Sequence, residues 1–142
     1  MRPLKVLILQ DNPFQLMTLH QMLNAFRIFD VLTAESVEAA RRSLAKCGAI
    51  DVAICELFKD ECSGLELIRE LAKKREARAL IILSCAPLHV IDSAACLARK
   101  EGLKVLGCLP NPVTPRGLEQ LLTSYQAPRF GFGDDISYDI AT

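Results

Sequence analysis

The sequence predicts a doubly wound α/β fold, in which a mostly parallel sheet is covered by helices on both faces. Short apolar runs alternate five times with segments of helical periodicity between Leu4 and Tyr125. This order favours parallel strands joined by right-handed crossovers. The runs are rich in Val, Ile and Leu, as in strands buried on both faces. With 142 residues, 51% of them hydrophobic and 24% charged, the chain has the size and composition of one ordinary domain.

The first strand and helix are indicated by an apolar run followed by a capping signal. Residues 4–9 form a short apolar run typical of a buried strand. Asn12 and Pro13 supply an N-cap and a first-turn proline, and residues 28–34 are predicted to be the second strand. The apolar period of the helix between these strands is carried by Phe14, Leu16, Met17, Leu19, Met22, Leu23 and Phe26.

The middle of the chain contains the clearest strand. Glu35–Ser36 opens a helix that ends at Gly48, because glycine commonly follows the last helical turn. Asp51–Glu56 is an almost continuous apolar strand that ends in a carboxylate. A loop extends to Gly64, and a helix with apolar residues up to Leu71 follows.

The last third of the chain repeats the alternation twice. Residues 79–83 are predicted to be a fourth strand, and a helix over residues 88–100 closes at Gly102. Residues 104–108 are a fifth strand. The helix Pro115–Leu122 begins with proline at its first turn.

Composition limits the class of partner. Lys plus Arg and Asp plus Glu number 17 each, so the formal net charge is zero. We therefore expect no nucleic-acid or membrane partner for this domain. Neither a membrane-spanning apolar run, which needs roughly 18 residues, nor a signal-peptide pattern is present, and we expect a cytoplasmic protein.

The cysteines are expected to be reduced thiols, most of them small buried residues within apolar runs. They are Cys47, Cys55, Cys62, Cys85, Cys96 and Cys108. Their spacing contains no CxxC pair, which disfavours a zinc site. A thiol switch between Cys85 and Cys108, at the ends of neighbouring predicted strands, stays open as an alternative function.

Polar residues follow the predicted strands at the edge where ligands bind in open parallel sheets, beyond the carboxyl ends of the strands. They are Gln10 and Asp11 after the first strand, Glu56 at the end of the third, Ser84 after the fourth and Asn111 after the fifth. These are the candidate functional residues. Simpler structural roles also exist: a helix cap for Asp11, a solvated strand end for Glu56, and turn residues for Ser84 and Asn111.

Between Leu4 and Tyr125 the chain resembles the receiver domains of bacterial two-component response regulators. The stretches that carry the resemblance are Val6–Pro13, Asp51–Glu56, Ser63–Leu67, Ile81–Ser84 and Leu109–Val113. The resemblance implies a flavodoxin-like (βα)5 fold with strand order 2-1-3-4-5. It also implies a receiver domain at residues 1–125, followed by a tail or linker at residues 126–142.

Receivers hold Mg²⁺ with two acids after the first strand and accept a phosphoryl group on an Asp that ends the third. A Ser or Thr after the fourth strand, a Lys before a Pro that is often cis, and an aromatic switch residue complete the pattern. The resemblance places Asp11 at one of the two metal-binding acid positions, Ser84 at the hydroxyl position and Pro112 at the proline position.

Four positions depart from the pattern. Gln10 replaces the other acid, Glu56 the phosphoacceptor, Asn111 the lysine and Cys108 the aromatic residue. The departures remove metal-binding capacity and positive charge that an incoming phosphoryl group needs. Glu56 partly imitates a phosphorylated aspartate, although with one negative charge rather than about two.

We therefore hypothesise a degenerate receiver, or pseudo-receiver, that acts as a regulatory and protein-interaction module independently of phosphorylation. It is not expected to be an enzyme, and no cofactor is expected. The alternative is an active receiver that is phosphorylated on Glu56 or Ser84, with weakened Mg²⁺ binding at Asp11 and Glu56.

The resemblance also implies partners. They are a histidine kinase, an output domain or another regulator. The stretches 6–15, 47–57 and 102–112 are similar to receivers that precede EAL-type cyclic di-GMP phosphodiesterase domains. A homodimer through the fourth helix, fifth strand and fifth helix is plausible, with apolar residues nearby at Leu97, Leu103, Val105 and Leu118. The segment 126–142, rich in glycine, acid and aromatic residues, is interpreted as a flexible tail, a linker to an output domain, or an aromatic plug or added strand.

Overall fold

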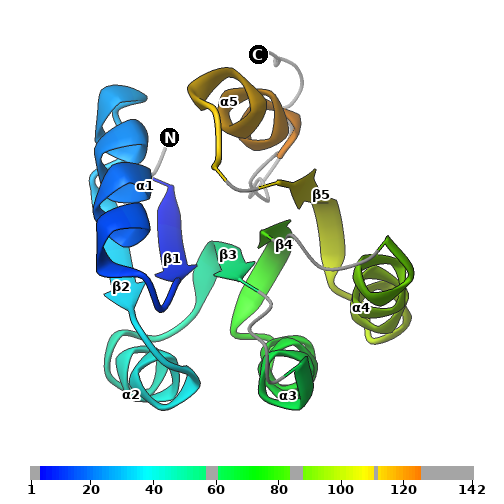
Figure 1. The fold of residues 1–142 in the computed structure, drawn as a ribbon. Coiled ribbons are helices and arrows are strands. Elements are labelled where there is room, and N and C mark those ends of the chain that lie inside the picture. The colour runs from blue at the N-terminus through cyan, green and yellow to red at the C-terminus, as the bar shows by residue number, and fades with distance from the viewer. Residues whose placement is uncertain (1–3, 57–60, 84–87, 111, 126–142) are drawn as a thin grey trace, which may run out of the picture.

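The computed structural model describes residues 4–56, 61–83, 88–110 and 112–125. They form five parallel strands and five helices, in strict alternation along the chain (Figure 1). The elements are β1 (Lys5–Leu9), α1 (Pro13–Ala25), β2 (Asp30–Ala34), α2 (Val37–Cys47), β3 (Ile50–Glu56), α3 (Glu61–Lys73), β4 (Ala77–Leu83), α4 (Leu88–Lys100), β5 (Lys104–Leu109) and α5 (Pro115–Ser124).

The strands form one sheet in the order β2-β1-β3-β4-β5. Every neighbouring pair is parallel. The predicted doubly wound, flavodoxin-like class with strand order 2-1-3-4-5 is thus confirmed. In this part of the chain no helix is both long and apolar enough to cross a membrane.

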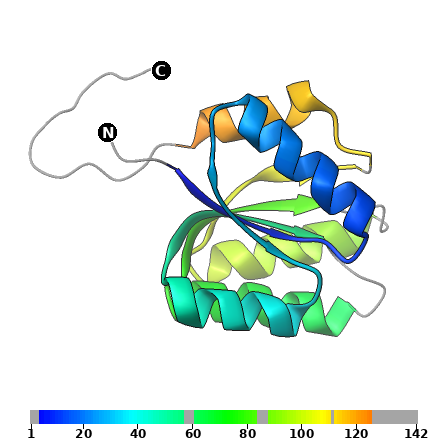
Figure 2. The same ribbon diagram turned by 90° about the vertical axis from the view of Figure 1, so that its left-hand side faces the viewer.

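Two helical layers cover the sheet, α1 and α5 on one face and α2, α3 and α4 on the other (Figures 1 and 2). Alternate residues of each central strand supply the two cores. In β1, for example, Leu7 packs towards α2 and α3, whereas Ile8 packs towards α1 and α5. The central strands are buried on both faces, which explains why their sequences lack polar alternation.

Helix starts follow the predicted capping signals. The Asn12 side chain accepts hydrogen bonds from the backbone N–H groups of Phe14 and Gln15, at 2.9 and 3.1 Å. Ser36 caps α2 in the same way, through the N–H of Ala39. Asn12 is therefore the cap of α1, and the helix-cap role considered for Asp11 is wrong.

Helix α1 is less deeply embedded than its apolar period indicates. Leu16, Leu19 and Leu23 are buried, but 80% of Phe14 and 59% of Met17 are exposed. A helix on one face of a sheet buries a stripe three to four residues apart, and apolar residues outside that stripe face solvent.

Three elements begin two or more residues away from the predicted start. Helix α3 begins at Glu61, so Gly64 lies inside the helix rather than before it. A glycine costs a helix only about 1 kcal/mol relative to alanine, and surrounding packing readily overrides it. Strand β2 begins at Asp30 rather than residue 28, and β4 begins at Ala77 rather than residue 79, because pairing with neighbouring strands rather than apolarity sets strand ends.

Strand β5 contains a bulge. Leu80 pairs with Val105 but Ile81 pairs with Gly107, so Leu106 is the extra residue. Gly107 lies against α5, where a Cβ atom would stand 2.7 Å from Leu121 Cδ2. The absence of a side chain at this position lets α5 approach the strand.

A bidentate ion pair joins α2 to α3. Arg41 Nε and Nη2 donate to the two carboxylate oxygens of Glu70, at 2.9 and 2.7 Å. The hydrogen bonds from Arg41 hold the pKa of the Glu70 carboxyl below its ordinary value.

Candidate functional site

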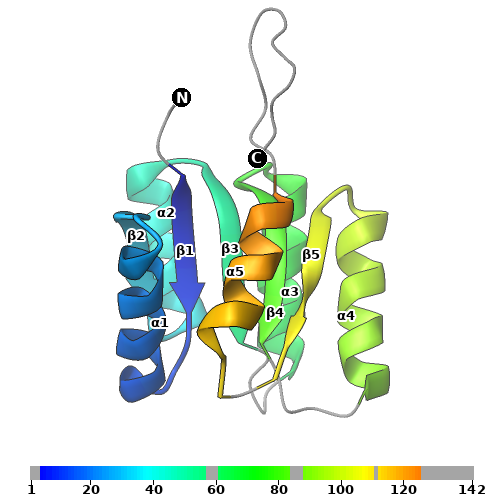
Figure 3. The ribbon, with the colours of Figure 1, turned by 90° about the horizontal axis from the view of Figure 1, so that it is seen from above.

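The candidate site lies at the edge of the sheet where the carboxyl ends of the strands meet (Figure 3). Leu9 at the end of β1 is the register partner of Cys55, one residue before the end of β3. This register brings Gln10, which follows β1, beside Glu56, which ends β3. Two of the residues predicted from strand ends therefore meet.

The side chain of Gln10 bridges Glu56 and the start of α1. Its Nε2 donates to Glu56 Oε1 at 3.0 Å, and its Oε1 accepts from the backbone N–H of Asn12 at 3.1 Å. Only 1% of Gln10 is exposed, and its own backbone N–H donates to the carbonyl of Ala34. These two hydrogen bonds of the side-chain amide fix the orientation of Gln10, with the amide nitrogen directed towards the Glu56 carboxylate.

Glu56 and Asp11 have different surroundings. Glu56 is half-buried and pairs with Leu83 of β4. Asp11 is exposed. Among the described residues no group of three or more His, Cys, Asp or Glu side chains is arranged to hold a metal ion.

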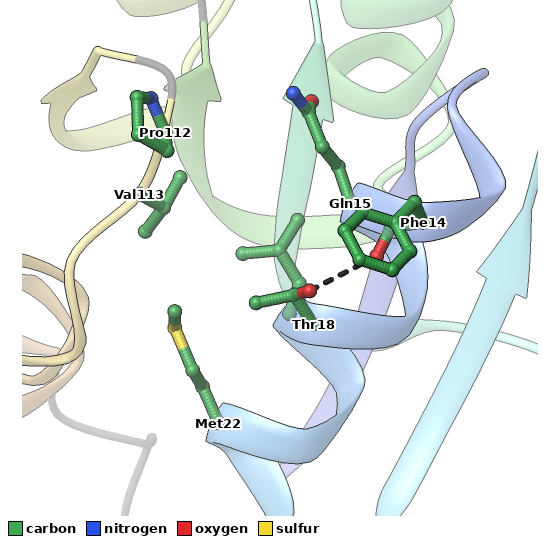
Figure 4. A pocket seen from close by; sticks show the side chains of 7 residues that line it. Phe14, Gln15, Thr18, Met22, Pro112 and Val113 are labelled. Carbon is green, nitrogen blue, oxygen red and sulfur yellow. Dashed lines mark hydrogen bonds between the residues drawn. The ribbon is translucent and has the colours of Figure 1, made fainter.

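An apolar pocket of about 240 Å³ lies close to this edge (Figure 4). On one side are Phe14, Thr18 and Met22 of α1, and on the other are Pro112 and Val113, which follow β5. Thr18 Oγ1 donates a hydrogen bond to the backbone carbonyl of Phe14 at 3.0 Å, within α1. The pocket and the exposed Phe14 give this end of the domain an apolar surface.

The fold, the edge and its residues can now be compared with known proteins. No family model matches the chain. A response regulator receiver domain protein from Clostridium thermocellum is 31% identical, with a TM-score of 0.67, over 84% of this chain and 90% of that one. The chain belongs to the response regulator receiver family. A response regulator from Colwellia psychrerythraea is 25% identical with a TM-score of 0.70, over 87% of this receiver and 96% of that chain.

A curated relative extends the comparison. Cyclic di-GMP phosphodiesterase RocR of Pseudomonas aeruginosa is 30% identical over 129 residues, which are 91% of this receiver and 33% of that protein. The receiver thus spans about a third of the length of this relative.

Two of the predicted receiver positions, Ser84 and Asn111, lie outside the described residues. Cys85, named in the thiol-switch alternative, also lies outside them. Pro112 is described, exposed and part of the apolar pocket, but the peptide bond that precedes it involves residue 111 and so the predicted cis geometry also lies outside the described part.

Cys108, predicted from the resemblance to occupy the aromatic switch position, is exposed on β5. Its register partner is Ile82, which belongs to the core under α2, α3 and α4. Partial burial and the negative charge of Asp92 raise the pKa of the Cys108 thiol. A raised pKa lowers the thiolate fraction of Cys108. Cys85, the other cysteine of the thiol-switch alternative, lies outside the described residues, so that alternative stays a prediction.

The prediction that most cysteines are buried is wrong for those described. Cys55 is buried, whereas Cys47, Cys96 and Cys108 are exposed. Cys47 and Cys96 lie on solvent faces of helices, where an apolar neighbourhood in sequence does not imply burial. Burial of Cys55 raises the pKa of its thiol to about 12.

Sequence reasoning missed a polar cluster at the opposite edge of the sheet. Asp51, of which 1% is exposed, accepts hydrogen bonds from the backbone N–H of Lys5 and from the hydroxyl of Tyr125, each at 2.9 Å. A carboxylate second in an apolar strand is a weak signal for such a cluster, because Tyr125 lies 74 positions further along the chain.

Proposed function

We propose that this receiver is degenerate and acts as a regulatory, protein-interaction module that does not depend on phosphorylation. The observation that carries the proposal is the hydrogen bond from Gln10 Nε2 to Glu56 Oε1 at 3.0 Å. An amide donor thus faces the residue at the phosphoacceptor position, where the family has a second carboxylate.

The residues at this edge offer few oxygen ligands for Mg²⁺. An amide N–H group cannot ligate Mg²⁺, which takes oxygen ligands, and the amide oxygen of Gln10 already accepts from Asn12. Among the predicted receiver positions, Asp11 and Glu56 are the ones that carry a carboxylate. We propose that they bind Mg²⁺ weakly or not at all, and that the domain uses no cofactor.

The Glu56 carboxylate differs from a phosphoacceptor aspartate in its hydrogen-bond partner and in its length. Attack on a phosphoryl donor requires a carboxylate oxygen that approaches phosphorus while cations neutralise the charge that accumulates. At Glu56 one oxygen is held by Gln10, and the side chain is one methylene longer than aspartate. The carboxylate instead supplies a constant negative charge at this edge, which favours one conformation without a phosphorylation step.

Exposure to acetyl phosphate and Mg²⁺, followed by intact mass measurement at neutral pH, tests this proposal. We expect no added phosphoryl mass on the native protein, and addition on a Glu56→Asp, Gln10→Asp, Asn111→Lys variant. Glu56→Gln is the matched control, because it removes the carboxylate at nearly constant size. Phosphorylation of the native protein that Glu56→Gln abolishes would establish an active receiver that uses Glu56, and phosphorylation that survives this change would point to another acceptor such as Ser84.

The metal proposal has its own test. Titration with Mg²⁺, followed through the amide NMR signals of Gln10 and Asp11, should show no saturable shift in the native protein. The Gln10→Asp, Glu56→Asp variant should gain one. Saturable binding to the native protein would contradict the proposal.

The similarity to RocR supports a proposal about the output. We propose that this receiver regulates an EAL-type phosphodiesterase domain, either in the same polypeptide or as a partner, and that it has no enzymatic activity of its own. Joining the receiver to such a domain should change its rate of cyclic di-GMP hydrolysis. Glu56→Gln, which removes the charge, should reverse that change.

The partners of a receiver include a second copy of itself. We propose that a homodimer would form through α4, β5 and α5, where Leu97 and Val105 are partly exposed. Leu103 and Leu118, also expected near this face, are buried at 3% and 0% exposure and belong to the core. Sedimentation of the native protein and of a Leu97→Asp variant tests the dimer, since the variant should be monomeric at concentrations where the native protein is not.

A further inference from the structure

A groove between α1 and α5 lies at the edge of the sheet opposite Glu56. Its volume is about 220 Å³, and it is lined by Leu4, Phe26, Ile28, Glu119, Leu122 and Thr123. The helices α1 and α5 cover the same face of the sheet (Figure 2), and the groove opens near the end of each. Its lining is mostly apolar, with Glu119 as an exposed acidic residue.

The point at which the chain leaves the described domain is fixed beside this groove. Helix α5 ends at Ser124, and the next residue, Tyr125, donates its hydroxyl to the buried Asp51 at 2.9 Å. Leu122 and Thr123, which precede Tyr125 by three and two residues, line the groove. The segment 126–142 therefore starts from a defined position at the groove.

The sequence of that segment matches the groove in size and charge. Phe130 lies five residues after Tyr125. An extended chain of five residues reaches up to about 17 Å. Cavities of about 150 Å³ lined by Leu, Ile and Phe accept a benzene ring, so the groove has room for one phenyl ring. Arg129 precedes Phe130 and has a charge opposite to that of Glu119.

We propose that segment 126–142 folds back on its own domain and inserts the Phe130 side chain into the α1–α5 groove, with Arg129 beside Glu119. The segment is favoured over a second copy because a short tether gives an effective concentration in the millimolar range. The contact would join the end of α5 to α1. The path of the segment after Tyr125 would then be set by its contact with the groove.

Methyl NMR of the full chain tests the contact. The methyl groups of Leu4, Ile28 and Leu122 should show ring-current shifts that Phe130→Ala removes. Phe14→Ala is the matched control, because it deletes the same side chain from an 80% exposed position on α1 outside the groove. Unchanged groove methyl signals in Phe130→Ala, or equal changes in Phe14→Ala, would overturn the proposal.

A charge exchange tests the second part of the contact. Glu119→Arg and Arg129→Glu should each reduce the ring-current shifts, and the double variant should restore them. Reductions that simply add in the double variant would contradict the pairing. The shifts should also persist on dilution, whereas their loss on dilution would assign the groove to a second copy of the chain and sink the proposal.

Discussion

The two ends of β3 each carry a carboxylate, and the two differ in what holds them. Asp51, near the amino end, is buried and accepts from the backbone N–H of Lys5 in β1 and from the hydroxyl of Tyr125, which follows α5. Glu56, at the carboxyl end, is half-buried and accepts from the amide of Gln10.

The difference indicates a structural role for Asp51, whereas the role that we propose for Glu56 is regulatory. The donors to Asp51 come from elements that are remote in sequence, so this carboxylate holds the start of the sheet to the end of the last helix. The donor to Glu56 comes from the neighbouring strand end, at the edge where receivers meet their ligands. A buried carboxylate with fixed donors stabilises the fold, whereas Glu56 is only half-buried and keeps part of its surface in solvent.

The largest expected effect concerns the stretch of β3 between the two carboxylates. The pKa of the Cys55 thiol is raised from 9.0 to about 12 by burial, which lowers its thiolate fraction about a thousandfold. In iodoacetamide labelling at pH 8, Cys55 should remain unmodified while the exposed Cys47 and Cys96 react, as peptide mass spectrometry would show. Labelling in denaturant, where all cysteines should react, is the control, and modification of Cys55 at the rate of Cys47 in the native protein would contradict burial of the strand.

Breaking the amino end of β3 should destabilise the fold next most strongly. Asp51→Ala leaves the Lys5 N–H and the Tyr125 hydroxyl without this acceptor, which should lower the free energy of unfolding by about 3 kcal/mol. Urea denaturation measures the change. Asp51→Asn, which retains one acceptor oxygen, should lose less, and a loss under about 1 kcal/mol in Asp51→Ala would contradict the structural role.

Removing one donor to Asp51 should have an intermediate effect. Tyr125→Phe deletes only the hydroxyl and should cost about 1.5 kcal/mol in urea denaturation. In the Asp51→Ala background the same change should cost much less, since its partner is already gone. Equal costs in both backgrounds would show that the hydrogen bond contributes little.

At the carboxyl end of β3 the expected effect on stability is the smallest. Glu56→Gln keeps an acceptor for Gln10 and should change the free energy of unfolding by less than about 0.5 kcal/mol. Destabilisation by Glu56→Gln as large as that by Asp51→Ala would remove the contrast between the two ends.

Much of this architecture follows from local sequence signals. Asn12, Ser36 and Pro115 mark helix starts, and continuous apolar runs mark the central strands. Strand order then places Gln10 beside Glu56, because the carboxyl ends of neighbouring parallel strands share an edge. The meeting of these two residues could therefore be predicted, although the direction of the amide could not.

Other features depend on contacts that no local pattern records. The bond between Asp51 and Tyr125 joins residues 74 positions apart, and a strand-internal aspartate has many possible donors. Phe14 and Met17 are exposed because they lie outside the stripe of α1 that faces the sheet, and the apolar period alone does not separate them from the buried Leu16. Gly64 lies within α3 because packing of the later turns outweighs a poor helix former.

The bulge in β5 determines the helix towards which residue 108 points. Successive side chains of a strand alternate between faces, and the extra Leu106 shifts that parity by one. Cys108 consequently shares a face with Ile82 and lies within the electrostatic influence of Asp92 and Arg99 of α4. In a regular strand that kept Leu106 in the ladder, Leu106 would pair with Ile81 and residue 108 with Leu83, which belongs to the core under α1 and α5. The register of β5 therefore decides which helix residue 108 faces, whatever the residue at this position.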